Sequence, residues 1–200
     1  GATTLNNSLT VAGDTTLQGN TTAENNLTVG GVANVTGQTS FDGSASADTV
    51  VGSAEANANL DDSYGLDADF SSIASDAQLT GLSNVANLAS AQATSDGEAK
   101  ADSDTYDSVG AYLDTSEIGG VASIGGQSTT NSAAQALNVS GKAEAEESTY
   151  QSTGLWADQI KVDADATIQG IGGATSSADA SSTEGDADAN AATEYAYGAQ

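Results

Sequence analysis

The chain has 200 residues and a formal net charge of −25 at pH 7, because 28 residues are acidic and only three are basic. Such a charge argues against nucleic acid and anionic membrane surfaces as partners. No apolar run approaches the roughly 18 residues that a membrane-spanning helix needs, so we expect no membrane insertion. The chain has neither His nor Cys, which removes the commonest catalytic bases and nucleophiles, and we expect no enzymatic activity.

Residues 5–47 carry an apolar side chain at every sixth position. These positions are Leu5, Val11, Leu17, Ala23, Val29, Val35, Phe41 and Ala47. An amphipathic helix would instead place apolar residues three and four apart. Six residues suffice for a short strand and a corner, and three such sides would close a coil of about 18 residues. The pattern predicts an all-β fold, a parallel β-solenoid, and it is too regular for the disordered chain that strong acidity otherwise favours.

The six-residue period stops after Ala47 and starts again three times, at Ile73, Ile118 and Val162. These starts are 44 or 45 residues apart, and Val29 lies 44 residues before the first of them. A unit that recurs at such a spacing indicates one supersecondary structure that has been copied and stacked. We predict a single repeat domain over residues 1–200, with regular six-residue coils in 1–51, full repeats in 52–96, 97–140 and 141–184, and a partial repeat in 185–200.

The segments between the periodic blocks all begin with Gly-x-Ala-x-Ala, at Gly52, Gly97, Gly141 and Gly185. Alanine at alternate positions predicts a strand whose face lies close to its neighbour. Such an insert could form a hairpin beside the solenoid or join the parallel stack as an elongated coil, and we favour the elongated coil. A β-sandwich filament subunit is the alternative fold.

Two six-residue units, 29–34 and 35–40, place an aliphatic residue four positions before Ala or Thr. With this pattern the chain resembles hexapeptide-repeat β-helices, and residues 9–31 look like β-helical segments of phage tail fibres and bacterial surface fibres. The resemblance implies a β-helical fold. Hexapeptide acyltransferases and the related carbonic anhydrases use His for catalysis or metal ligation, and because this chain lacks His, the resemblance implies no enzymatic function.

Acidic residues recur at fixed repeat positions. Asp69, Asp114 and Asp158 share one position, where stacked coils would bring them into a row and Ca²⁺ could offset their repulsion. The alternative, which we favour, is a solvated acidic face, and no other cofactor is expected. A second row consists of Glu55, Lys100, Glu144 and Asp188. In the stack, Lys100 should therefore lie between two acidic residues.

The aromatic residues of the inserts could form a sugar-binding or surface-binding strip, but we favour packing against glycine-rich turns. They are Tyr64, Tyr106, Tyr112, Tyr150, Trp156, Tyr195 and Tyr197. Three threonines spaced by 18 residues, Thr3, Thr21 and Thr39, suggest an ice-binding row, although the later repeats do not extend it.

Five Asn-x-Ser/Thr sequons permit N-glycosylation. They begin at Asn6, Asn20, Asn26, Asn34 and Asn138. They are compatible with an extracellular or cell-surface location, which the abundance of Asn, Thr, Ser, Gly and Ala also suggests. The chain starts without Met or a signal peptide, which is typical of a processed or excised chain.

A solenoid has an open sheet edge at each end, and natural monomers cover such edges. The last Gly-x-Ala-x-Ala strand resembles an unfinished repeat that another copy's N-terminus would complete. From Ala180 to Leu5 of a following copy would be 25 residues, close to the 26 or 27 between earlier blocks. Head-to-tail strand addition of this kind does not close and produces a filament. The predicted assembly residues are Leu5, Val11 and Leu17 at one end, and Gly185, Ala187, Ala189, Tyr195, Tyr197 and Gly198 at the other.

The sequence therefore predicts a structural subunit of a self-assembling extracellular filament, a homopolymer without a small-molecule substrate. The alternatives are the shaft of a phage tail fibre or of a surface adhesin, which would be a binding module, and a piece of a longer repeat protein.

Overall fold

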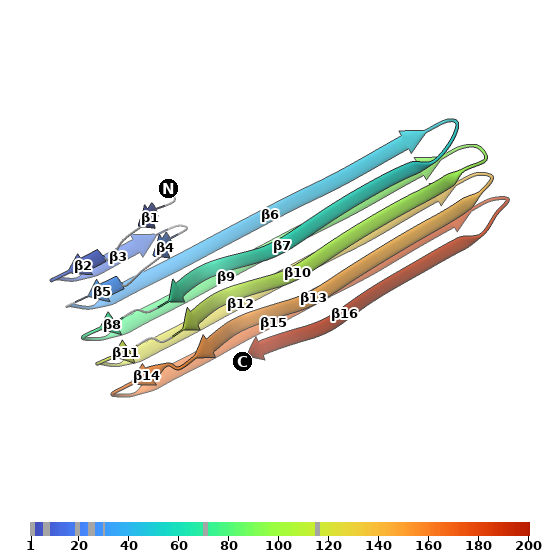
Figure 1. Cartoon of the computed structure of the whole chain (residues 1–200). Helices are drawn as coiled ribbons and strands as arrows, with labels where there is room; N and C mark the ends of the chain where they lie inside the picture. The colour runs from blue at the N-terminus through green and yellow to red at the C-terminus, as the bar shows by residue number, and fades with distance from the viewer. Residues whose placement is uncertain are drawn as a thin grey trace.

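The computed structural model describes residues 3–5, 9–18, 21–23, 27–29, 31–69, 72–114 and 117–200. These residues form sixteen strands and no helix, and accordingly they contain no helix able to cross a membrane. Every strand pairing is parallel, and the strands stack into three sheets that run along one axis (Figure 1). The predicted parallel β-solenoid is confirmed.

One long sheet, which we call sheet 1, has six strands in the order β1-β4-β7-β10-β13-β16. They are β1 (Thr3–Leu5), β4 (Thr21–Ala23), β7 (Ala54–Asp69), β10 (Glu98–Asp114), β13 (Lys142–Asp158) and β16 (Ala187–Ala199). The second long sheet, sheet 2, has the order β15-β12-β9-β6-β3. Its strands are β3 (Thr15–Gln18), β6 (Ala33–Thr49), β9 (Ala77–Ala93), β12 (Ala122–Asn138) and β15 (Ala166–Ser182).

The third sheet, the corner sheet, joins sheets 1 and 2 at one side of the stack. Its short strands are β2 (Leu9–Val11), β5 (Leu27–Val29), β8 (Ser72–Ile73), β11 (Glu117–Ile118) and β14 (Lys161–Val162). The chain thus winds through five coils, which are β1–β3, β4–β7, β8–β10, β11–β13 and β14–β16.

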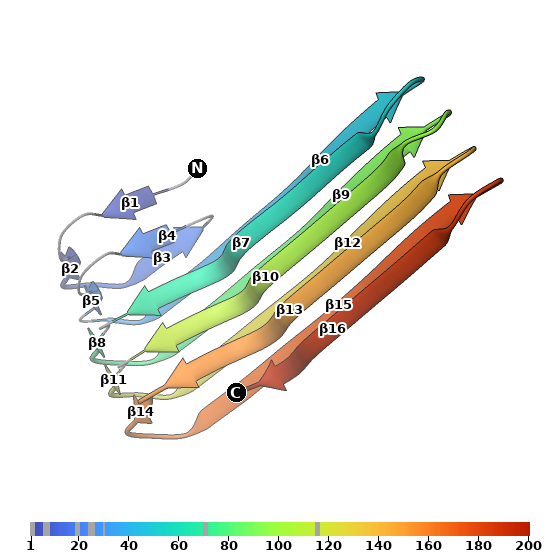
Figure 2. The same ribbon diagram turned by 45° about the vertical axis from the view of Figure 1, so that its right-hand side comes forward.

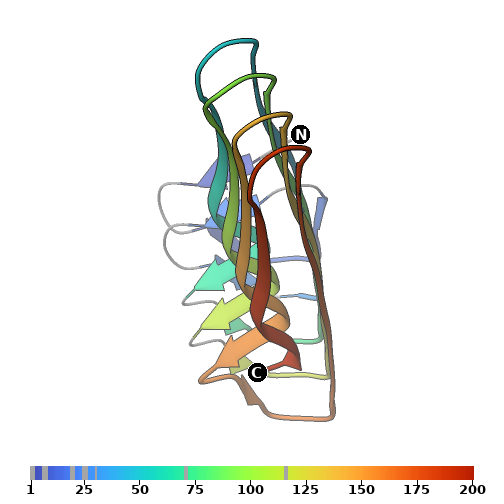
Figure 3. The same cartoon turned by 90° about the vertical axis from the view of Figure 1, so that its right-hand side faces the viewer.

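The first coil is much smaller than the others. Thr3 pairs with Thr21, eighteen residues on, whereas Thr22 pairs with Asp67, forty-five residues on. Each later coil is therefore flattened: a long strand of sheet 2 leads through a turn into a long strand of sheet 1, and the two strands form facing walls (Figure 3). The inserts are part of the parallel stack, as we favoured, because β6 and β7 belong to different sheets and do not pair as a hairpin.

The six-residue unit adopts two different structures in this chain. In the first coil each unit is a separate short strand. In β6, however, Val35, Phe41 and Ala47 lie on one straight strand of 17 residues, so the expectation of a corner after every sixth residue fails there. Six is a multiple of the two-residue period of a strand, so residues six apart also share a face without any corner.

We call the part of each coil near the corner sheet the base, and the remainder the arm. The arms comprise residues 37–66, 81–111, 126–155 and 170–199. The base holds an aliphatic core that includes Leu79, Leu113, Ile118 and Ile124. The arm holds a separate core made of alanines alone. Because burying one Leu or Ile contributes about 1.5–3 kcal/mol and a methyl group contributes less, the base supplies more hydrophobic stabilisation per residue than the arm.

Glycines mark the boundary between base and arm. In each large coil a glycine of sheet 2 faces one of sheet 1, as in Gly81 opposite Gly110 and Gly126 opposite Gly154. A Cβ atom on Gly81 or Gly126 would overlap the carbonyl oxygen of its facing glycine. The backbones of the two sheets therefore touch at this point, which we call the glycine waist.

Candidate functional site

The end of the stack formed by β14, β15 and β16 is an open edge, because each of these strands has a neighbour on one side only. We call it the lower edge. All thirteen residues of β16 are exposed, and β15 alternates between exposed and half-buried residues over most of its length. The predicted assembly residues Gly185, Ala187, Ala189, Tyr195, Tyr197 and Gly198 lie on β16 or in the turn before it. An edge of this kind offers a row of backbone groups to another strand.

The opposite end of the stack is formed by the first coil. The predicted assembly residues lie one in each sheet, where Leu5 pairs with Ala23, Val11 with Val29 and Leu17 with Val35. Val11 is half-buried, and the side chains of Leu5 and Leu17 lie outside the described residues.

The first coil covers only the base of the second. β3 of the first coil pairs with residues 33–36 of β6, and β4, the short strand that begins the second coil, pairs with only two residues of β7, Asp67 and Ala68. Within the described residues, no strand pairs with the outer edge of 37–49 in β6 or of 54–66 in β7. Figure 2 shows these two strands projecting beyond the small first coil. We call this step in the stack the ledge.

The spacing that we expected between successive copies is wrong. It treated Leu5 as equivalent to Ile73, but Leu5 pairs with Ala23, which in turn pairs with Ala68 of sheet 1. Ile73 instead pairs with Val29 of the corner sheet. The two positions therefore belong to different sides of the coil. The six-residue period could not show this, because it does not say which side of the coil a residue occupies.

The sequons differ in accessibility. Asn34 is exposed on β6. Asn138 is only 5 % exposed, and its amide nitrogen donates hydrogen bonds to the carbonyl groups of Gly97 and Lys142. The folded chain leaves Asn138 no open side for a glycan. Asn6, Asn20 and Asn26 lie outside the described residues.

The threonine row is shorter than the spacing suggested. Thr3 and Thr21 are neighbours in sheet 1, but Thr39 lies in sheet 2, where it pairs with Ser83. The Thr39 hydroxyl donates inward to the carbonyl group of Tyr64 at 2.5 Å. Three threonines therefore do not form one face.

The aspartate row is confirmed as a row. Asp114 lies between Asp69 and Asp158 on neighbouring strands of sheet 1. Among the described residues, however, no three carboxylates converge to surround a metal ion. Parallel stacking alone places one carboxylate per layer, whereas Ca²⁺ binds six to eight oxygen atoms at 2.3–2.6 Å.

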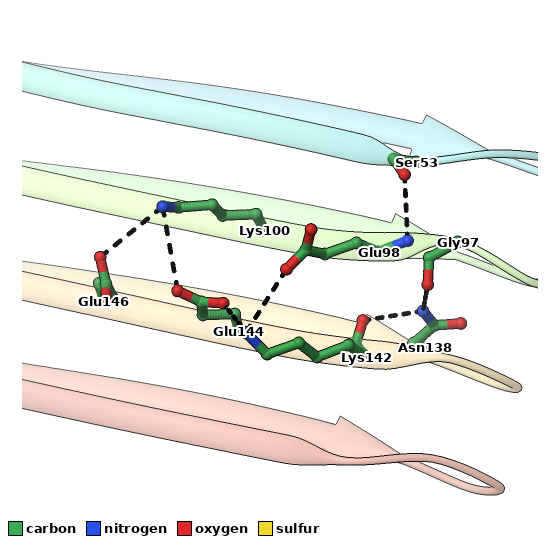
Figure 4. Close-up of polar contacts among 8 residues, drawn as sticks. All are labelled: Ser53, Gly97, Glu98, Lys100, Asn138, Lys142, Glu144 and Glu146. Carbon is green, nitrogen blue, oxygen red and sulfur yellow. Dashed lines mark hydrogen bonds and ion pairs between the residues drawn. The ribbon is translucent and has the colours of Figure 1, made fainter.

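The second acidic row is also confirmed, with Lys100 between Glu55 and Glu144 in register. Figure 4 shows Lys100 beside Glu144 and Glu146 of the next strand. The ammonium group of Lys100 lies 3.9 Å from Glu144 and 3.8 Å from Glu146. Lys142 forms a hydrogen bond with Glu144, which raises the pKa of Lys142 and lowers that of Glu144.

The third lysine, Lys161, also lies between acidic residues. Lys161 contacts Glu117 at 2.6 Å and Asp163 at 3.1 Å, and the hydrogen bond to Glu117 raises the pKa of Lys161. All three lysines thus lie between acids of their own or neighbouring layers, where they reduce the repulsion that stacking creates.

Six of the seven aromatic residues of the inserts form two groups on sheet 1. Tyr112 contacts both Tyr64 and Trp156, with ring centroids 5.8 Å and 6.0 Å apart. Burial, followed by the charges of nearby aspartates, raises the pKa of Tyr64 to about 12. The second group lies towards the lower edge, where Tyr195 contacts Tyr150 at 5.6 Å and Tyr197 at 5.7 Å.

A buried chain of serine hydroxyls crosses the arm, and the sequence reasoning missed it. Consecutive Oγ atoms lie 2.8–3.0 Å apart, and each step passes from one sheet to the other. The chain runs through Ser63, Ser83, Ser108, Ser128 and Ser152. A signal was available, because these serines lie two residues before a waist glycine in sheet 1 and two residues after one in sheet 2.

Some acidic residues lie inside or partly inside the stack. Glu147 is only 3 % exposed, and its carboxylate accepts a 2.8 Å hydrogen bond from Thr149, while its second oxygen has no partner. Burial raises the pKa of Glu147. Burial and a neighbouring carboxylate also raise the pKa of Asp104 and of Asp107.

No protein-family model, curated protein or solved structure matches the chain.

Proposed function

We propose that the chain is a structural subunit of an extracellular filament in which copies stack head to tail along the solenoid axis. The observation that carries this proposal is the pair of open edges at opposite ends of a stack whose large coils share one cross-section. A contact between opposite ends is heterologous, and because the stack is translational rather than closed, repeated contacts extend it.

The composition of the lower edge supports this role. Proteins that must stay monomeric blunt their edge strands with Lys, Pro or inward-pointing charges. β15 and β16 carry no Lys or Pro, and the inward positions of β15 near the arm turn are small residues such as Ala178 and Ala180. Main-chain hydrogen bonds of strand addition would supply the affinity.

An extracellular location and a homopolymer without substrate or cofactor complete the proposal. The acidic exterior would keep subunits soluble before they assemble, since net charge of one sign disfavours random association. The arms would then add parallel strand layers at a spacing of about 4.8 Å.

Electron microscopy of concentrated protein tests the proposal, with two matched variants. Ala180→Lys places a charge on an inward, half-buried position of the open edge, whereas Ser181→Lys places it on the exposed face beside it. We expect filaments from the natural chain and from Ser181→Lys, and monomers with unchanged circular dichroism from Ala180→Lys. A natural chain that stays a monodisperse monomer at millimolar concentration would overturn the proposal.

A second function, the shaft of a tail fibre or an adhesin, is favoured by the exposed tyrosines of sheet 1. Tyr106, Tyr150 and Tyr195 are 52 %, 45 % and 42 % exposed, and aromatic rings on a flat face can bind sugars or surfaces. Binding to polysaccharide-coated beads that Tyr106→Ala and Tyr150→Ala abolish would support it. Equal retention of the natural chain and the variants would exclude it.

A further inference from the structure

We infer that the ledge, and not the first coil, receives the next copy: β15 and β16 of one copy pair in parallel with β6 and β7 of its neighbour. In this arrangement strands β1, β2 and β3 of the first coil leave the base of the neighbour, and the last coil of the incoming copy takes their place. The inference rests on the proposed head-to-tail assembly and specifies the contact.

Strand length favours the exchange. The strands of the first coil contain three, three and four residues, while β15 contains 17 and β16 contains 13. A copy that stacked on the first coil would leave the facing arms one strand layer too far apart to pair. A copy that replaces the first coil pairs along base and arm together, so the exchange gains many more main-chain hydrogen bonds than it loses.

The glycine waist gives both edges the same cross-section. At the ledge a Cβ atom on Gly37 would overlap the carbonyl oxygen of Gly65, and at the lower edge a Cβ atom on Gly170 would overlap that of Gly198. Both pairs are aligned with the waist glycines of the coils between them. The arm of an incoming copy would therefore meet an arm whose two sheets approach each other at the same position along the strands.

Side-chain sizes inside the stack also match across the contact. One row of sheet 1, buried in its first three layers, alternates large and small residues: Leu66, Ala111, Leu155 and Ala199. On the ledge, Ala199 would meet Leu66 of the neighbour and continue the alternation. A row of sheet 2 decreases in size from the ledge to the lower edge, through Phe41, Val85, Thr130 and Ala174, so the smallest residue would meet the largest.

One row that contains aromatic residues also supports docking on the ledge. The row that contains Tyr64, Val109, Thr153 and Tyr197 is aromatic only in its first and last layers. Docking on the ledge would place Tyr197, which is 37 % exposed in one chain, beside Tyr64 of the neighbour. The two rings would then form an aromatic pair of the kind already present between Tyr64 and Tyr112.

The charges at this contact would make assembly depend on salt. Docking places Asp188 beside Glu55 of the neighbour and Glu194 beside Asp61, with no lysine between them in register. Within the chain, by contrast, Lys100 separates Glu55 from Glu144. Since salt screens exposed charges over about 10 Å at 0.1 M, we expect faster filament growth at 0.5 M than at 0.02 M sodium chloride.

Engineered disulfides decide between the two docking sites, because the natural chain has no Cys. Ser46 and Asp179 are exposed, belong to one outward row and would be neighbours only across a ledge contact. Thr16 and Thr167 would be neighbours only if the last coil docked on the first coil. Within one copy each pair is separated by several layers, too far for a disulfide.

We expect covalent oligomers from oxidised filaments of Ser46→Cys/Asp179→Cys and none from Thr16→Cys/Thr167→Cys. Filaments that cross-link only through the second pair would overturn the ledge contact and leave the filament itself intact. A chain that forms no filaments at all would overturn both.

A lock on the first coil provides an independent test. Thr16 and Asn34 are exposed Cα partners, so Thr16→Cys/Asn34→Cys can fix the first coil to the second. The matched control, Asn34→Cys/Gln78→Cys, joins two layers that stay together in either arrangement. We expect oxidation to stop growth of the locked variant, reduction to restore it, and the control to grow throughout. Growth of the oxidised, locked variant at the natural rate would overturn the inference.

Discussion

The hydroxyl group of Ser108 lies 2.8 Å from that of Ser128, although the two serines belong to facing sheets. Ser108 also lies 2.9 Å from Ser83, so one side chain links two strands of the opposite wall. The hydroxyl chain is buried between the aliphatic core of the base and the alanine core of the arm, and it connects the two walls there.

Replacing Ser108 by Ala should destabilise the chain. Ser83 and Ser128 would each lose a buried partner, which costs about 1–3 kcal/mol in the free energy of unfolding. Urea unfolding followed by circular dichroism measures it. The control is Ser46→Ala, which is exposed and should stay within about 0.5 kcal/mol. Equal midpoints for the two variants would show that the hydroxyl chain does not stabilise the fold.

Adding a methyl group at the glycine waist should destabilise the fold more than removing the Ser108 hydroxyl group does. A Cβ atom on Gly110 would overlap the backbone of Gln127 and of Gly154. Because backbone atoms cannot move aside as a flexible side chain can, Gly110→Ala should cost more than about 3 kcal/mol or prevent folding. Gly173→Ala is the matched control, since nothing lies within 4 Å of its Cβ position. A folded Gly110→Ala with the natural melting temperature would refute the close approach of the sheets.

Replacing Lys100 by Gln should make stability depend more on salt. The change leaves Glu55 and Glu144 on either side of a neutral residue, without the ammonium group that lies 3.9 Å from Glu144. Because the group is partly exposed and screened, we expect a loss within about 1 kcal/mol at low salt, which 0.5 M sodium chloride should largely restore. Melting temperatures at two salt concentrations check this, and a loss that is equal at both would contradict it.

The buried carboxyl group of Glu147 should make the folded chain more stable at mildly acidic pH than at pH 7. Burial raises the pKa of Glu147 above its ordinary value of 4.5. As the pH rises through that value, the unfolded chain loses its proton first, so stability falls until the pH exceeds the pKa of the folded state. The raised pKa values of Asp104 and Asp107 act in the same direction.

Glu147→Gln isolates this contribution. The neutral amide mimics the protonated carboxyl group, so the variant should melt at a higher temperature than the natural chain at pH 7 and at the same temperature near pH 4. Thermal melts across this range measure the difference. A variant that is less stable at pH 7 would show that the charged form is stabilised inside the arm.

Metal removal should leave stability unchanged. Asp114 has a carboxylate neighbour in each adjacent layer, but the described residues do not enclose a Ca²⁺ site. We expect the same melting temperature in millimolar calcium and in excess chelator. A rise with calcium that Asp114→Asn removes would revive the calcium hypothesis.

Much of the register could be predicted from the sequence because parallel stacking places equivalent residues side by side. The row of Val29, Ile73, Ile118 and Val162 was predicted from spacing and is a ladder of the corner sheet. The position of Lys100 between two acids followed from the same alignment. What spacing could not show was where the chain bends, since residues six apart share a face both around a coil and along a straight strand.

The recurrence of side chains at fixed intervals was enough to predict the parallel stack, the super-repeat and the rows of the long repeats. It was not enough for the first coil, because Thr39 lies outside the row of Thr3 and Thr21. How the two long sheets face each other became visible only in the folded chain. Contacts across the arm join residues such as Ser108 and Ser128 that are not equivalent in the repeat, so no periodicity relates them. The waist, the hydroxyl chain, the buried Glu147 and the ledge all arise from that facing.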